Sequence, residues 1–145
     1  MSLPAPEPGL VIRYSYLWLD EYREGREEGV KDRPCAIVAA IREESGRHRV
    51  LCLPVTHLRP LRPEWAIEIP HSVKLRLGQD DERSWIIVSK ANEFAWPGPD
   101  LRPIPEGKHN ILTYGFLPPS FFNQVRGLFL RLVAAQLTIS VPRSE

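Results

Sequence analysis

The sequence predicts a mainly β fold in which five short strands precede one C-terminal helix. Three observations support this prediction. The apolar segments are short and rich in Val, Ile, Tyr and Trp, polar turns containing Gly or Pro separate them, and residues 118–136 carry apolar side chains at helical spacing. The chain has 145 residues, 43% of them hydrophobic, which suffices for one core. We therefore expect a single domain over residues 1–145.

The first half of the chain contains the clearest strand signals. A Pro-rich arm over residues 1–9 precedes a strand at 10–19, and the charged, Gly-containing segment 20–32 is a long loop. The apolar runs 34–41 and 48–55 flank a short polar turn with one Gly. This pattern predicts a β-hairpin.

The second half contains two further strands, a loop and the helix. Residues 65–69 and 84–91 read as strands, with a turn or one short helical turn at 75–83 between them. Four prolines make 97–110 a loop, because proline cannot continue a central strand or a helix interior. The helix over 118–136 begins at Pro118-Pro119-Ser120. Its predicted apolar face comprises Phe122, Val125, Phe129, Leu132 and Val133.

A strand meander followed by one helix is typical of small, partly open barrels, either SH3-like or OB-like. The N-terminus lacks the features of a signal peptide, and no apolar run is long enough to span a membrane, so a cytosolic protein is expected. Cys35 and Cys52 lie in strand-like runs and are expected to be buried free thiols. No cysteine or histidine has zinc-ligand spacing, so we expect neither a metal nor another cofactor.

Charge is unevenly distributed although the net charge is only +1. Residues 46–76 carry six basic and two acidic side chains, whereas residues 20–32 carry three basic and six acidic ones. The basic segment is either a solvated surface or a face that binds nucleic acid. The candidates for nucleic-acid binding are Arg47, Arg49, Arg59, Arg62, Lys74 and Arg76, with Trp65 as a base-stacking residue.

Five short motifs occur in order along the predicted strands and loops. They are Leu17-Trp18-Leu19-Asp20, then Glu28, then Arg33-Pro34-Cys35-Ala36-Ile37-Val38, then Leu53-Pro54-Val55-Thr56-His57, and Phe94-Ala95-Trp96. Over residues 8–96 this series resembles the MazF/PemK (Kid) growth-inhibitor toxins of toxin-antitoxin systems. The Pro-rich segment 97–110 departs from the family pattern.

The resemblance implies a fold, an activity and partners. Such toxins have an SH3-like barrel, form homodimers, and cut single-stranded RNA without a metal, by attack of the ribose 2′-hydroxyl on the adjacent phosphorus. Many are neutralised by an antitoxin protein, and some toxin-antitoxin complexes bind their promoter DNA. The amphipathic helix also carries Leu128 and Leu130 outside its main face, which favours a homodimer.

The resemblance also implies the site residues. Arg33 matches the family's catalytic arginine and Thr56 its active-site threonine; His57 is a candidate acid or base, and Glu28 a candidate base or partner of Arg33. Each has a structural alternative: an ion pair for Arg33, a backbone hydrogen bond for Thr56, a structural role for His57, and a solvated surface position for Glu28.

The main departure from the family is Ser89-Lys90, which stands where many relatives carry an acidic residue. The leading hypothesis is therefore an endoribonuclease toxin. The alternatives are a binding module that retained the barrel but lost cleavage, and a protein-binding SH3-like adaptor.

Overall fold

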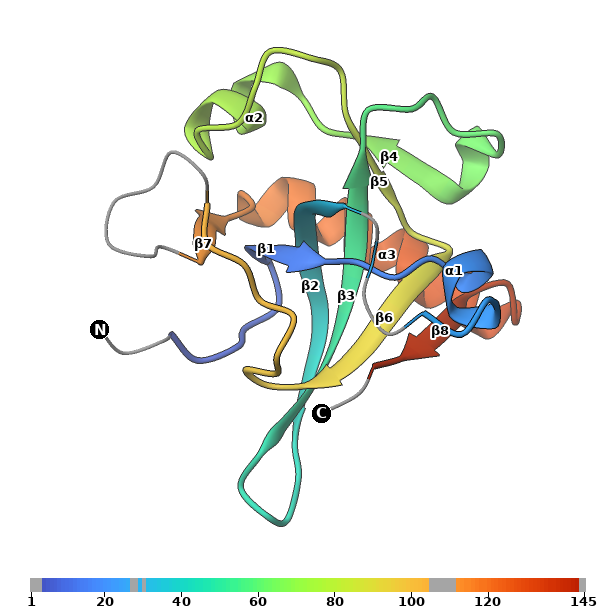
Figure 1. Cartoon of the computed structure of the whole chain (residues 1–145). Helices are drawn as coiled ribbons and strands as arrows, with labels where there is room; N and C mark the ends of the chain where they lie inside the picture. The colour runs from blue at the N-terminus through green and yellow to red at the C-terminus, as the bar shows by residue number, and fades with distance from the viewer. Residues whose placement is uncertain (1–3, 27–28, 30, 105–111, 144–145) are drawn as a thin grey trace.

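The computed structural model describes residues 4–26, 29, 31–104 and 112–143. The fold is mainly β, as predicted, with a long C-terminal helix (Figure 1). The strands are β1 (Leu10–Ser15), β2 (Asp32–Arg42), β3 (His48–Thr56), β4 (Ala66–Glu68), β5 (Trp85–Ile87), β6 (Lys90–Ala95), β7 (Thr113–Phe116) and β8 (Ile139–Pro142). The helices are α1 (Leu19–Arg23), the 3₁₀ turn η1 (Pro63–Trp65), α2 (His71–Arg76) and α3 (Pro119–Ala134).

The strands form one eight-stranded sheet in the order β4-β5-β3-β2-β1-β7, and β6 pairs with both β3 and β8. Every pairing is antiparallel except that of β6 with β8, which is parallel. The sheet is not closed into a barrel. Strands β2 and β3 form the predicted hairpin, which extends beyond the rest of the sheet in Figure 1.

The central strands are buried on both faces, which explains why their sequences are almost continuously apolar. In β2, Ala36 and Val38 belong to one core cluster, whereas Cys35 and Ile37 belong to the other. This alternation follows from the two-residue period of a strand. Cys35 and Cys52 are buried free thiols, as expected, and burial raises the pKa of the Cys35 thiol.

Helix α3 covers the face of the sheet that carries the first of these clusters, and Figure 1 shows it crossing behind the central strands. The helix begins one residue later and ends two residues earlier than predicted, and its buried side chains are Phe121, Val125, Phe129 and Leu132. Two details of the predicted face were wrong: Phe121 lies deeper than Phe122, and Val133 is exposed. The apolar stripe is therefore narrower than predicted, but Val125, Phe129 and Leu132 are buried as expected.

Four local predictions also need correction. Strand β1 ends at Ser15, and α1 occupies part of the predicted loop 20–32. The predicted strand 84–91 is split into β5 and β6 by a turn, and the short helix α2 begins at His71. The sequence did not predict β7 or β8. Each has only four residues, which is too short for the alternation of apolar and polar side chains to be recognised.

A buried polar network connects β8 to the rest of the sheet. The Arg143 guanidinium donates to the Ser15 carbonyl at 2.6 Å and to Asn92 Oδ1 at 2.9 Å, and it lies 3.0 Å from Asp100 Oδ2. Asn92 in turn exchanges two 2.8 Å hydrogen bonds with the Leu17 backbone. The network fixes the chain just before Trp18, whose indole borders the pocket described below. Among the described residues, no helix is both long and apolar enough to cross a membrane.

Candidate functional site

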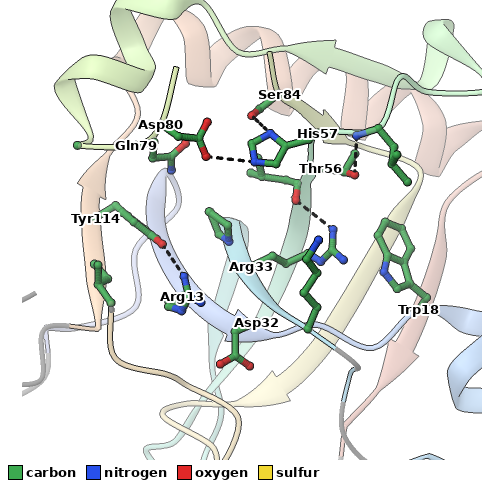
Figure 2. Close-up of a pocket in the computed structure, with 16 residues that line it drawn as sticks. Arg13, Trp18, Asp32, Arg33, Thr56, His57, Gln79, Asp80, Ser84 and Tyr114 are labelled. Atoms are coloured by element: carbon green, nitrogen blue, oxygen red, sulfur yellow. Dashed lines mark hydrogen bonds and ion pairs between the residues drawn. The ribbon is translucent and has the colours of Figure 1, made fainter. Parts of the chain in front are cut away.

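A pocket of about 780 Å³ opens where β1, β2 and β3 meet the segment that follows α2. Its wall includes three basic side chains, Arg13, Lys31 and Arg33, and two acidic ones, Asp32 and Asp80. In Figure 2, Arg13 from β1 and Arg33 from β2 lie on one side of the pocket, and Asp80, from the loop after α2, lies on the other side beside His57. The predicted residues Arg33, Thr56 and His57 all line it.

Arg33 lies near the start of β2 and is half-buried. Its Nη1 lies 3.4 Å from the Val55 carbonyl, and its guanidinium carbon lies 5.1 Å from the centroid of the Trp18 ring. Its Nε is buried and has no hydrogen-bond partner among the described residues. The ion pair with Asp32 that was one alternative for Arg33 is not seen among the described residues, because Asp32 lies 3.7 Å from Arg102 instead; the other suggested partner, Glu28, lies outside the described residues.

Trp18 forms a side wall of the pocket and also contacts the core. The indole is partly buried and packs against the core cluster that contains Cys35 and Ile37. Besides the Arg33 guanidinium, the Lys90 ammonium lies 5.3 Å from the ring centroid. An aromatic face between two cations is a surface on which an unpaired base can stack.

Thr56 ends β3 with 9% of its surface exposed. Its hydroxyl oxygen accepts a hydrogen bond from the Leu58 N–H at 3.1 Å, which is the local backbone interaction that was the alternative for this residue. The hydroxyl retains its proton for a second hydrogen bond, since a hydroxyl both donates and accepts.

His57 contacts a group of polar side chains from the segment that follows α2. Its Nε2 lies 3.1 Å from Asp80 Oδ2 and 3.5 Å from Glu82 Oε2. Its Nδ1 lies 3.2 Å from the Arg83 carbonyl and 3.0 Å from Ser84 Oγ. The imidazole is 43% exposed, so it is positioned by these contacts and still borders the pocket.

Lys74 donates hydrogen bonds to the same group of residues from the buried side. It is 2% exposed, and its ammonium donates to Asp80 Oδ1 and Ser84 Oγ, each at 2.6 Å, and to the Glu82 carbonyl. The pKa of the Asp80 carboxyl is lowered: partial burial would raise it, but hydrogen bonds from Lys74 and from the Glu82 N–H, with the nearby charges, outweigh that effect. Asp80 is therefore ionised at neutral pH.

Ser84, His57 and Asp80 are in mutual contact, but they are not arranged for nucleophilic catalysis. Ser84 is fully buried, so a substrate cannot reach its hydroxyl. Its oxygen already accepts from the Lys74 ammonium, which lowers its nucleophilicity. We therefore treat Ser84 as a structural partner of His57.

The sequence matches no protein-family model and no curated protein. The assignment of function thus depends on the geometry of the pocket.

The residues predicted to bind nucleic acid do not gather at this pocket. Lys74 is buried in an internal ion pair and is not available for a phosphate contact. Arg49 lies 3.4 Å from Glu93, and Arg62 covers the Trp65 ring at 4.6 Å and lies 3.3 Å from Glu64. The remaining three candidates are exposed and do not line the pocket: Arg47 in the hairpin turn, Arg59 in the loop after β3, and Arg76 on α2.

Two further predicted positions lie away from the pocket or outside the described chain. Glu28 is outside the described residues. Ser89, where the sequence departs from the pattern of the resembling toxins, is buried in the turn before β6, and its carbonyl accepts from the Ile139 N–H at 2.8 Å.

Sequence reasoning missed the other basic residues of the pocket. Arg13 interrupts an otherwise apolar strand, a signal that could have identified it, and its Nη1 donates to the Tyr114 hydroxyl at 3.3 Å. Lys31 precedes β2 and is exposed. Asp80 and Tyr114 reach the pocket only through the tertiary fold, so no local pattern marks them.

Proposed function

We propose that the protein is an endoribonuclease of the MazF/PemK type that binds and cuts single-stranded RNA without a metal. The observation that carries the proposal is that Arg33 and Thr56, which the resemblance selects from two separate motifs, line one pocket together with His57, which is a candidate because an imidazole can act as acid or base. We also propose the SH3-like family fold, which the β1-β2-β3 meander and the C-terminal helix support.

Arg33 is proposed to stabilise the negative charge that grows on the phosphorus oxygens during attack by the 2′-hydroxyl. Its guanidinium is already held against the Val55 carbonyl and the Trp18 ring, so it need not reorganise during the reaction. Arg13 and Lys31 add positive charge along the same pocket. Stabilisation by one such preorganised donor is worth about 3 to 4 kcal/mol.

His57 is proposed to transfer the proton, as base for the 2′-hydroxyl or as acid for the leaving oxygen. Its exposed edge borders the pocket, and contacts on both ring nitrogens hold its orientation. Thr56 is proposed to donate to a phosphate oxygen through its remaining hydroxyl proton. Trp18 is proposed to stack one base, which suits a single strand because duplex bases are not free to stack.

The test is incubation of a long RNA of mixed sequence with the purified protein in the presence of EDTA. A long substrate is needed because a short oligonucleotide can lack the preferred motif. We expect discrete fragments that persist in EDTA. An RNA that stays intact at stoichiometric protein would reject the enzyme.

A second candidate function is RNA binding without cleavage. The observation that favours it is that Thr56 and both ring nitrogens of His57 already have partners within the chain. The substitution of Ser89-Lys90 for the family's acidic position points the same way. Retention of single-stranded RNA on the protein, without fragments, would support this alternative over the nuclease.

We further propose that the protein forms a homodimer, is bound by an antitoxin, and contacts promoter DNA as that complex. Exposed apolar side chains along the end of α3 and the start of β8 support self-association: Leu130, Val133, Leu137 and Ile139. A monomer mass by light scattering at tens of micromolar would contradict the homodimer.

A further inference from the structure

Three side chains that face one another beside the pocket carry atoms that ligate metals. They are His57, Asp80 and Glu82, and one ligand atom of each lies within 4.8 Å of the others. His57 Nε2 lies 3.1 Å from Asp80 Oδ2 and 3.5 Å from Glu82 Oε2. Ligand atoms held about 2.0 to 2.2 Å from one tetrahedral zinc lie about 3.3 to 3.6 Å apart. The two separations from His57 Nε2 are thus close to those that a single ion requires.

The histidine is placed so that a metal can replace one of its protons. Nδ1 lies 3.2 Å from the Arg83 carbonyl, which accepts only from an N–H, and 3.0 Å from Ser84 Oγ. The carboxylate oxygens beside Nε2 also accept only from an N–H, so a metal ion bound there takes the place of the Nε2 proton while Nδ1 keeps its own. Metal-ligating histidines are commonly fixed in this way, by donation from the second ring nitrogen to a carbonyl.

The aspartate divides its two oxygens between the protein and the candidate metal position. Oδ1 accepts from the Lys74 ammonium at 2.6 Å and from the Glu82 N–H at 3.0 Å. Oδ2 faces His57 instead. Lys74 therefore orients the ligand from the buried side, which is the function of an outer-shell hydrogen bond around a metal.

The nearest arginine is held elsewhere. Arg83 makes two 2.8 Å hydrogen bonds to Glu68, so it does not neutralise Glu82. The carboxylates of Asp80 and Glu82 are 51% and 72% exposed, and an ion can enter directly from solvent.

We propose that His57, Asp80 and Glu82 form a binding site for a divalent first-row transition-metal ion, for which Zn²⁺ is the probe. One imidazole nitrogen and two carboxylate oxygens suit zinc and its neighbours better than Mg²⁺ or Ca²⁺, which prefer all-oxygen ligands. Water completes the coordination on the exposed side. No local sequence pattern marks this site, because the histidine and the two acids are brought together only by the packing of the loop after α2 against the end of β3.

The site has a consequence that rests on the proposed function. A metal bound to Nε2 takes the lone pair that a general base uses and excludes the proton that a general acid donates. Zn²⁺ should therefore inhibit RNA cleavage, whereas EDTA should leave it intact. This is the opposite of metal-assisted hydrolysis, in which chelation abolishes activity.

Calorimetric titration of the full chain with Zn²⁺ tests the site without reference to RNA. We expect one ion per chain, and at least a tenfold weaker affinity in Asp80→Asn and Glu82→Gln. The matched controls are Asp81→Asn, the exposed carboxylate between the two ligands, and His71→Ala, an exposed histidine on α2. Both should bind as the wild type does. Because Asp80→Asn removes the partner of Lys74, Glu82→Gln is the decisive variant if Asp80→Asn fails to fold.

Absence of Zn²⁺ binding by the wild type, or equal affinity in Glu82→Gln and Asp81→Asn, would overturn the site. With Co²⁺ as probe, an absorption band in the visible that is lost in Glu82→Gln would be a second sign of a specific site. If calorimetry shows the predicted Zn²⁺ binding but Zn²⁺ does not slow RNA cleavage, only the predicted inhibition is overturned. Failure of the protein to cut RNA would leave the calorimetric result standing, so the two proposals are separable.

Discussion

His57 Nε2 lies 3.1 Å from Asp80 Oδ2, and the other oxygen of the same carboxylate accepts from the buried ammonium of Lys74 at 2.6 Å. Asp80 thus bridges the exposed imidazole of His57 and the buried ammonium of Lys74. Because Lys74 is almost fully buried, it requires these hydrogen bonds, and the position of His57 depends on them in turn. Stability and site geometry are linked through one carboxylate.

This link predicts a dependence of stability on pH. The pKa of Asp80 is lowered from its ordinary value of 3.8, so the folded state favours the ionised carboxylate. Its stabilising contribution is complete above that ordinary value and is lost as the pH falls through the lowered pKa. In urea unfolding, the difference in free energy of unfolding between wild type and Asp80→Asn should be largest near neutral pH and shrink in acid.

The control for this experiment is Asp81→Asn, which removes an exposed neighbouring carboxylate. Its free energy of unfolding should differ from that of the wild type by less than about 0.5 kcal/mol near neutral pH. If the difference in free energy of unfolding between wild type and Asp80→Asn stayed constant from neutral pH to about pH 2, the proposed role of Asp80 would be contradicted.

The Arg143 network predicts a large effect of a single buried substitution. Asp100→Ala removes the carboxylate that lies 3.0 Å from a guanidinium buried within the sheet. Breaking such a buried pair costs about 3 to 5 kcal/mol because the remaining charge is left uncompensated. Chemical denaturation measures this loss. Glu64→Ala, which breaks the exposed pair with Arg62, should cost no more than about 1 kcal/mol, and similar losses in both variants would refute the distinction.

The pocket also predicts which tryptophan binds RNA. Trp18→Ala should weaken binding of single-stranded RNA by about 1 to 3 kcal/mol, the value of one base stacked on an aromatic ring. Trp65→Ala should have little effect, because Trp65 is not among the pocket residues. Fluorescence anisotropy with a labelled single strand measures both. Trp18→Phe, which keeps an aromatic face, should restore part of the affinity.

The sequence predicted the elements whose pattern is local. The β2–β3 hairpin and α3 were identified because alternation and helical spacing persist over enough residues to be recognised. The strands β7 and β8 were missed, since their pairing with β1 and β6 depends on segments distant in the sequence. Three of the five residues predicted for the α3 face are buried, and only its edges were wrong, at Phe122 and Val133, because helical spacing does not fix how far the sheet extends on either side of the helix.

The residues of the candidate site also fall into those that a local pattern predicted and those that it did not. Arg33, Thr56 and His57 were found because each stands within a short motif at a strand end. Asp80, Tyr114 and the wall formed by Trp18 depend on how the loop after α2 and strand β7 fold over the central strands. Lys74 was misplaced for a physical reason: a lysine in a basic segment is usually exposed, and only the ring of acceptors around its ammonium makes burial possible.

The most direct test of the central claim compares wild type with Arg33→Ala on a long mixed-sequence RNA in EDTA, with mass spectrometry of the fragment ends. We expect wild-type fragments that end in a 2′,3′-cyclic phosphate, and a rate for Arg33→Ala reduced about a hundred- to a thousandfold, equivalent to about 3 to 4 kcal/mol. Arg49→Ala, which alters an arginine outside the pocket, should cut at close to the wild-type rate. Intact RNA with stoichiometric wild-type protein, or equal rates for wild type and Arg33→Ala, would contradict the account.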